Sequence, residues 1–251
     1  MIIKYASIFV MMQFAAMQVF AQSNSALPGM KQAAVQASES QADTEWISYR
    51  NAYRLMIQFE KYGKAKHLIQ SHFQVASKAG NALPDNLQLN LVGKTMRLNL
   101  PLDVLGRASF PLLKSAYDEN AELTINQVAG QYIFQSRISI QTRADGVYEL
   151  ADLRQACEQA QTYLKSTGDI KVGNKACVGV RFSYPKNLSQ AGLKFRGADA
   201  QMHVLSLLDN SAFPDEANKA YKTATLRFAD VQEKGQLLTQ QTPIAIAPLF
   251  E

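Results

Sequence analysis

Residues 132–141 read YIFQSRISIQ, and they form the clearest strand pattern of the chain. Its even-numbered positions carry Tyr, Phe, Ser, Ile and Ile, whereas its odd-numbered positions carry Ile, Gln, Arg, Ser and Gln. Because successive side chains of a strand point to opposite faces, this alternation predicts a strand with one apolar and one polar face. The pair Asp145-Gly146, which follows, predicts a turn.

Stretches of the same kind lie upstream, at 69–75, 87–91, 96–100 and 123–125. Turns are predicted between them at Gly93-Lys94 and at 103–106, and Pro101 ends one strand. No helix-length segment separates the strands between 67 and 146. Short strands with one polar face each favour antiparallel sheets over a parallel α/β fold. We therefore predict a mainly β protein of the α+β class, an antiparallel β-sandwich packed by two helices.

Two segments have helical periodicity. The first begins at Asp43 or Thr44 as N-cap and ends at Gly63. Its apolar stripe consists of Trp46, Tyr49, Tyr53 and Ile57. The second ends at Gly168, and its apolar residues recur three or four positions apart: Leu150, Leu153, Cys157, Ala160 and Leu164. We expect both helices to pack against a sheet.

The last third of the chain is less regular. Residues 177–184 alternate as a strand, with Val178, Val180, Phe182 and Tyr184 on one face and Pro185 after it. Further strands are predicted at 202–208, 223–228 and 244–246, and a short helix at 213–216. These elements either complete the same sandwich or form a small second lobe from about residue 186. We identify no internal repeat that decides between the two arrangements.

The N-terminus has the pattern of a cleavable signal peptide over residues 1–21. Lys4 is the only charged residue there, an apolar run follows it, and the sequence Val19-Phe20-Ala21 predicts cleavage before Gln22. Gln13 and Gln18 interrupt the run, which disfavours a retained membrane anchor. Residues 22–44, rich in Ala, Gln and Ser, are predicted to form a flexible tether. We expect a periplasmic or secreted protein whose folded part, 45–251, has no transmembrane span.

Composition limits the chemistry further. The formal net charge is +5, and charges of both signs are mixed along the chain, which argues against a nucleic-acid binder. Cys157 and Cys177 form an even pair in an exported chain, so we predict a disulfide between them rather than a catalytic thiol. Since Cys177 alternates with Val178, Val180 and the residues of that face, we expect the bond to fix the helix to the other side of the strand.

No catalytic residue, cofactor site or metal site is predicted. His67 and His72 fall on opposite faces of a strand, and His203 is remote in sequence, so the three do not form a metal site. Nucleophile, Walker and dinucleotide-binding motifs are absent from the mature chain. The carboxylates Asp118, Glu119 and Glu122 are either a hydrolytic group or a solvated loop.

Five basic residues lie close together between positions 50 and 66: Arg50, Arg54, Lys61, Lys64 and Lys66. Glu60 is the only acidic residue within this stretch. Arg50 and Arg54 are four positions apart and therefore share a helix face. The cluster is either a contact surface for an anionic partner, such as lipid head groups, or a solvated basic face.

Two local resemblances complete the sequence evidence. Residues 46–54 (WISYRNAYR) and 59–70 (FEKYGKAKHLIQ) resemble uncharacterised exported proteins of Gram-negative bacteria, a family with no assigned function. Residues 98–110 (LNLPLDVLGRASF) resemble a hairpin of transthyretin-like and carboxypeptidase-regulatory-type sandwiches. The second resemblance implies an accessory or binding module.

We therefore predict a non-catalytic exported protein that binds or scaffolds an unidentified component of the cell envelope. The alternative is a hydrolase of an envelope polymer that uses scattered carboxylates. The position of Asp118, Glu119 and Glu122 discriminates between them, because a hydrolase requires these groups in one pocket.

Overall fold

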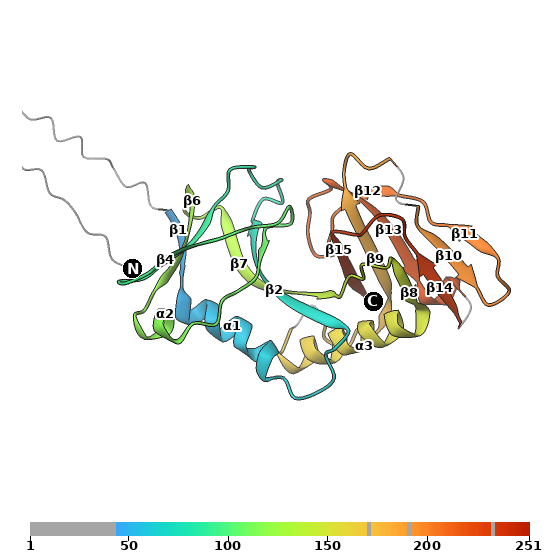
Figure 1. Cartoon of the computed structure of the whole chain (residues 1–251), viewed down its shortest axis with the longest axis horizontal. Coiled ribbons are helices and arrows are strands. Elements are labelled where there is room, and N and C mark those ends of the chain that lie inside the picture. The colour runs from blue at the N-terminus through green and yellow to red at the C-terminus, as the bar shows by residue number, and fades with distance from the viewer. Residues whose placement is uncertain (1–43, 170–171, 190–191, 232–233) are drawn as a thin grey trace, which may run out of the picture. The chain divides into compact units, whose positions relative to one another are not determined.

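The computed structural model describes residues 44–169, 172–189, 192–231 and 234–251 (Figure 1). All of them belong to one compact unit, residues 41–251. The predicted signal peptide and all but the last residue of the predicted tether lie outside the described residues.

The described residues form the following elements in chain order: β1 (Thr44–Ser48), α1 (Tyr49–Lys61), β2 (Ile69–Ser77), β3 (Leu89–Val92), β4 (Arg97–Leu100), β5 (Arg107–Ala108), α2 (Lys114–Asp118), β6 (Glu122–Val128), β7 (Tyr132–Ile140), β8 (Val147–Glu149), α3 (Leu150–Ser166), β9 (Cys177–Pro185), β10 (Lys194–Gly197), β11 (Met202–Val204), β12 (Leu208–Asn210), β13 (Tyr221–Arg227), the 3-10 helix η1 (Phe228–Asp230), β14 (Gly235–Leu238) and β15 (Ala245–Phe250).

These strands form three antiparallel sheets. Two have four strands each, in the orders β1-β6-β3-β4 and β11-β10-β14-β8, and the third has seven, in the order β12-β13-β9-β15-β7-β2-β5. Every pairing between described strands is antiparallel. The predicted class, mainly β with accessory helices and sheets packed together, is confirmed.

The order of the strands shows that one topology occurs twice. The small sheet β1-β6-β3-β4 has the same order as β8-β14-β10-β11, strand for strand along the chain. In the seven-stranded sheet, β7-β2-β5 has its counterpart in β15-β9-β13. We call residues 44–140 the first repeat and 147–250 the second repeat; they run from blue to green and from yellow to red in Figure 1. The sequence alone did not indicate this duplication.

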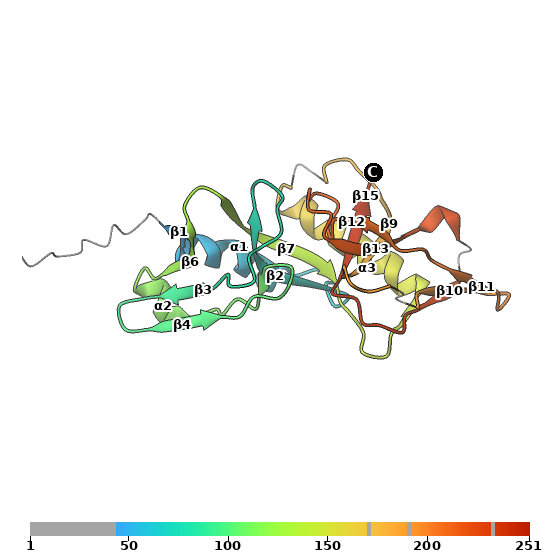
Figure 2. The same ribbon diagram turned by 90° about the horizontal axis from the view of Figure 1, so that it is seen from above.

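The helices repeat as well. Each follows a short edge strand directly, and each buries residues spaced by three, four and three positions. In α1 these are Tyr49, Ala52, Met56 and Phe59, and in α3 they are Leu150, Leu153, Cys157 and Ala160. This spacing keeps one face of a helix against the core. Figure 2 shows both helices, of which α1 contacts β2 and β7 and α3 contacts β9 and β15.

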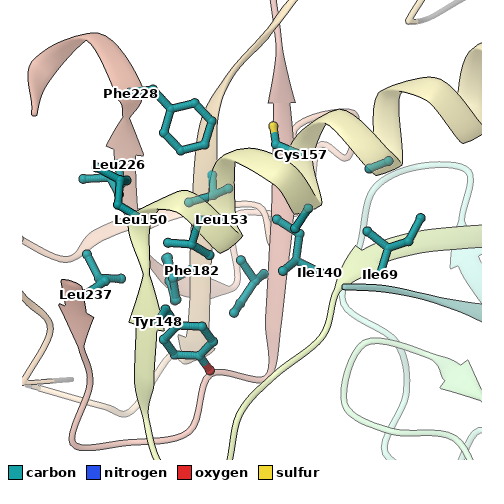
Figure 3. Close-up of a cluster of buried hydrophobic side chains, with 14 of the residues drawn as sticks. Ile69, Ile140, Tyr148, Leu150, Leu153, Cys157, Phe182, Leu226, Phe228 and Leu237 are labelled. Atoms are coloured by element: carbon teal, nitrogen blue, oxygen red, sulfur yellow. The ribbon is translucent and has the colours of Figure 1, made fainter. Parts of the chain in front are cut away.

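Both helices contact the apolar face of the seven-stranded sheet. The core of the second repeat combines α3, the strands β9, β13 and β15, and the small sheet, and Figure 3 shows Leu153 of α3 beside Phe182 of β9. Ile69, Ile138 and Ile140 of the first repeat belong to the same core. The first repeat also has a core of its own, in which Phe73, Leu91 and Leu123 are fully buried, so only the core of the second repeat combines side chains of both.

The N-terminal helix differs from the prediction at its start. Residues 44–48 form β1, which pairs with β6, and the helix begins at Tyr49 with Ser48 as its N-cap. The Ser48 side chain accepts a hydrogen bond from the Asn51 backbone N–H, at 3.3 Å. Trp46 therefore lies on an edge strand and is 55% exposed. Strand pairing with β6 overrides the aromatic spacing that suggested a longer helix.

The predicted disulfide Cys157–Cys177 is confirmed, with the two Cα atoms 5.9 Å apart. The side of the strand that it joins was predicted wrongly. Leu249 pairs with Gly179 but Phe250 pairs with Cys177, so β9 contains one extra residue at this point. Such a bulge reverses the alternation beyond it. Cys177 consequently reaches α3 on the side of the sheet where Phe182 also packs.

The segment after residue 186 completes the sheets rather than forming a separate lobe. Within it, β13 and β15 pair with β9, and β14 pairs with β8. The predicted helix at 213–216 is wrong, because these residues form a turn in which the Glu216 N–H donates to the Phe213 carbonyl. Phe213 is buried with Ala245 and Ala247, and this burial fixes the segment against β15.

Candidate functional site

A row of polar side chains lies on the face of the seven-stranded sheet opposite the helices. Register places His72 of β2 opposite Arg137 of β7, and Gln74 opposite Gln135. In the second repeat, Arg181 of β9 shares this face and donates to the Ser211 carbonyl at 3.2 Å. The segment 211–216 therefore crosses the polar face and covers part of it.

Arg137 is the centre of this face, and its side chain is only 11% exposed. Its Nη1 lies 2.7 Å from Asp215 Oδ1, and its Nη2 lies 3.2 Å from Glu216 Oε1. Its Nε donates to Gln74 Oε1 at 2.7 Å. Its guanidinium carbon lies 4.4 Å from the ring centroid of Phe213. Two carboxylates, an amide and an aromatic ring therefore fix one cation.

Glu216 is the most buried carboxylate of this network, with a side chain 16% exposed. Burial raises its pKa, while Arg137 and the hydrogen bond from Gln74 act in the opposite direction. Gln74 Nε2 donates to Glu216 Oε1 at 3.0 Å and also contacts the Leu105 carbonyl at 3.0 Å. Each of these polar groups is thus held in place by another, as expected for a preorganised site.

Two hollows adjoin Arg137 and share Gln135, Arg137 and Asp215. The first, about 380 Å³, lies between the end of β2 and the segment 215–221. The second, about 390 Å³, lies between β7 and β15 and reaches Leu164 of α3. Each is within the range of a small-ligand pocket, and both combine apolar walls with a few fixed polar groups.

His72 lies next to this network. Burial lowers its pKa, and so does Arg107, whereas Asp103 raises it. Its Nδ1 is buried without a hydrogen-bond partner among the described residues. We therefore describe His72 as a neutral imidazole of the polar face.

The five predicted basic residues do not form one continuous free surface. Arg50 donates to the Tyr117 carbonyl at 2.8 Å and lies over the Tyr117 ring. Lys66 donates to the carbonyls of Phe59 and Glu60 at the end of α1. The exposed members of the cluster are Arg54, Lys61 and Lys64.

The three predicted carboxylates lie apart from the hollows. Asp118 forms an exposed ion pair with Lys114, and Glu119 accepts a hydrogen bond from the Thr95 backbone N–H at 3.1 Å. Glu122 is exposed at the start of β6. None of the three lines either hollow beside Arg137.

Within the described ranges, no group of three or more His, Cys, Asp and Glu side chains has the geometry to hold a metal ion. In the same part of the chain, no helix combines the length and the apolar character that crossing a membrane requires.

Comparison with known proteins assigns the chain to no family. No family model matches the chain, and no curated protein and no solved structure is significantly similar to it. The geometry of the site therefore carries the functional argument.

Sequence reasoning missed the network around Arg137 because its members are distant in the chain. Arg137 lies 78 residues from Asp215 and 79 from Glu216. The available signal was an arginine in the middle of a strand, on its polar face. A long cation in that position requires partners if the face is covered.

Proposed function

We propose that this chain is an exported, non-catalytic binding protein of the bacterial cell envelope, and that its ligand occupies the hollows beside Arg137. The observation that carries the proposal is the rigid group Arg137, Asp215 and Gln135, which two hollows of ligand size share. Fixed polar groups in a partly apolar hollow are the usual basis of ligand recognition.

Binding is favoured over polymer hydrolysis by the state of the carboxylates. Asp118, Glu119 and Glu122 lie outside the hollows, and the first two have partners of their own. Three carboxylates line the hollows, Asp169, Asp215 and Glu216, and the two beside Arg137 are both paired with it. A general acid or base needs free access to the reacting group. The pairing with Arg137 favours recognition instead.

The site is tested by NMR on the isotope-labelled protein 22–251, titrated with fractions of a periplasmic extract. We expect chemical-shift changes concentrated on Gln135, Ser136, Arg137 and Asp215. The variant Gln135→Ala should weaken the response, while the matched change Asn99→Ala, on exposed β4, should not. Changes confined to residues outside the hollows would contradict the proposal.

Export is part of the same proposal. It is supported by the N-terminal pattern and by the disulfide, which forms in oxidising compartments. The intact mass of the protein recovered from the periplasm should correspond to a chain that begins at Gln22. Recovery with Met1 retained would contradict cleavage after Ala21.

A weak contact with an anionic surface is a second proposed property. It is supported by Arg54, Lys61 and Lys64, which are exposed along and just after α1. Each cation near an anionic membrane contributes about 1 kcal/mol. Co-sedimentation with anionic vesicles should therefore be weak and lost on adding salt, and the triple change to Gln should abolish it. No sedimentation even at low salt would refute this contact.

A further inference from the structure

The seven-stranded sheet is interrupted at its centre. β7 and β15, the equivalent strands of the two repeats, are paired only at Ile140 and Ile246. Beyond that pair the strands diverge, and the hollow of about 390 Å³ opens between residues 135–138 of β7 and residues 247–250 of β15. The two inner edges of one sheet therefore face each other across a gap.

The hydrogen bonds at the ends of β7 show which backbone groups face this gap. Gln141 N–H donates to the Leu68 carbonyl, and Lys78 N–H donates to the Gln131 carbonyl. In an antiparallel pair, hydrogen-bonded and non-hydrogen-bonded residue pairs alternate. Odd-numbered residues of β7 therefore bond to β2, and the N–H and C=O groups of even-numbered residues point away from β2.

The partners of these outward groups can be followed along β7. The N–H of Tyr132 donates to the Glu45 carboxylate at 3.2 Å, and Ile140 is paired with Ile246. Between them, Ser136 and Ile138 are paired with no residue of β15. Both residues line the hollow. Backbone donors and acceptors that lie away from water require partners.

Pro248 explains why the sheet parts here. If β15 continued in the register of Ile140 and Ile246, residue 248 would lie opposite residue 138. That position must donate a backbone N–H, and proline has none. The ladder therefore stops, and β15 presents an edge with one donor removed. Proline at such a place protects a strand edge, so the edge of β7 is the better partner for an incoming strand.

The gap is lined by both apolar and charged side chains. The apolar ones include Leu164, Val172 and Phe250, and the charged ones are Arg137, Asp169, Lys175 and Asp215. A strand inserted here would direct alternate side chains to opposite sides of the sheet. The gap therefore matches an extended segment that carries both apolar and polar residues.

We propose that the gap binds an extended peptide segment of a partner protein, which adds as a strand to the free edge of β7. This inference rests on the proposed binding function and names its ligand class. Main-chain hydrogen bonds to Ser136 and Ile138 supply affinity, and alternate side chains supply specificity.

The premise is tested first on the free protein by amide hydrogen exchange. Ser136 and Ile138 should exchange at least about tenfold faster than Arg137 and Ser139, whose N–H groups bond to β2. Equal protection of all four amides in the free protein would overturn the proposal, because it would mean that the edge is already paired.

Binding is tested with a random heptapeptide phage library selected against the protein 22–251, followed by synthesis of the selected peptides. Binding should slow the exchange of Ser136 and Ile138. N-methylation of alternate peptide residues should weaken binding by about tenfold or more, whereas methylation of the intervening residues should have little effect. Failure to select any binder, or insensitivity to N-methylation, would overturn the inference.

Pro248→Val restores the missing donor and should let β15 pair with Ile138, closing the gap and lowering peptide affinity by about tenfold. The matched control is Pro101→Val, at an exposed proline after β4. If Pro248→Val does not fold, the N-methyl series on the unaltered protein decides the question. Shifts at Gln135 and Asp215 with a non-peptide ligand, but no peptide binding, would leave the proposed function standing and refute this inference.

Discussion

The first and second repeats share one topology but are stabilised by different side chains. The core of the first repeat has a series of ring contacts that joins Tyr49, Phe110, Phe73 and Phe134. The second repeat has the disulfide Cys157–Cys177 and the Tyr148–Phe182 ring pair. Met56 occupies the helix position in α1 that Cys157 occupies in α3. The topology is therefore specified by which positions are buried, since the residues at those positions differ.

The largest effects should follow from truncating the central phenylalanines. Phe73 in β2 and Phe182 in β9 are both fully buried, so replacing either with Ala should cost about 3–5 kcal/mol of unfolding free energy. Because the core of the second repeat includes Ile69, Ile138 and Ile140 of the first, we expect a single transition in urea. It is measured by circular dichroism over the whole chain and by fluorescence of Trp46, which lies in the first repeat. Separate transitions by the two probes would show that the repeats unfold independently.

Removing the disulfide should have the next largest effect. Changing Cys157 and Cys177 to Ser opens a loop whose ends are 20 residues apart, which costs about 3 kcal/mol in the chain-entropy model. The loss is measured as a lower urea midpoint. The first repeat has no equivalent bond in the described residues, so local exchange should increase most in α3 and β9. A uniform increase over both repeats would argue against a local role.

A smaller effect is expected from Glu216→Gln, because Gln can still accept from Gln74 and Arg137. The raised pKa of Glu216 means that the folded state favours its neutral form. Protonated Glu216 therefore contributes most to the free energy of unfolding below the ordinary glutamate pKa, and this contribution falls as pH rises through the raised pKa. Urea midpoints of the two proteins, compared from about pH 4 to pH 8, should move in favour of the variant as pH rises. Parallel curves would contradict the raised pKa.

The smallest effects concern the ends of the two helices. α3 ends in a Schellman motif, in which Gly168 has φ +76° and the Asp169 N–H donates to the Leu164 carbonyl. Gly168→Ala should cost about 1 kcal/mol of unfolding free energy.

In α1, Lys66 binds the last carbonyls, and Lys66→Met should cost about 0.5 kcal/mol of unfolding free energy. Thermal melts distinguish these values. A larger loss for Lys66→Met would mean that α1 depends on its cap more than on its core contacts.

The strands that sequence predicted best are those with strict alternation. β7 and β2 were located because one face of each strand is apolar and the other polar. The turn after β3 was located from Gly93-Lys94. The strands β8, β10 and β14 were missed because they are only three or four residues long and have no clear period. The duplication was missed for a related reason, since equivalent positions such as Met56 and Cys157 share burial but not residue type.

The candidate site was less accessible to sequence reasoning than the fold. Arg137 could be placed on the polar face of its strand, but Asp215 and Glu216 belong to a segment that was predicted as a helix. Their approach to Arg137 depends on the burial of Phe213, a tertiary contact that no local pattern encodes. The basic cluster was visible in sequence, but the carbonyl contacts of Arg50 and Lys66 depend on where α1 ends and which loop lies beside it.

The single pairing of Ile140 with Ile246 has a consequence for symmetry. Equivalent strands of two repeats meet antiparallel there, which is the arrangement that a two-fold axis gives to the subunits of an isologous dimer. Two identical subunits would present two identical edges at such an axis, and an incoming strand could not distinguish them. Because both halves lie in one chain, one edge can carry Pro248 while the other keeps its donors. The two edges at this junction therefore differ, and an incoming strand can distinguish the edge of β7 from that of β15.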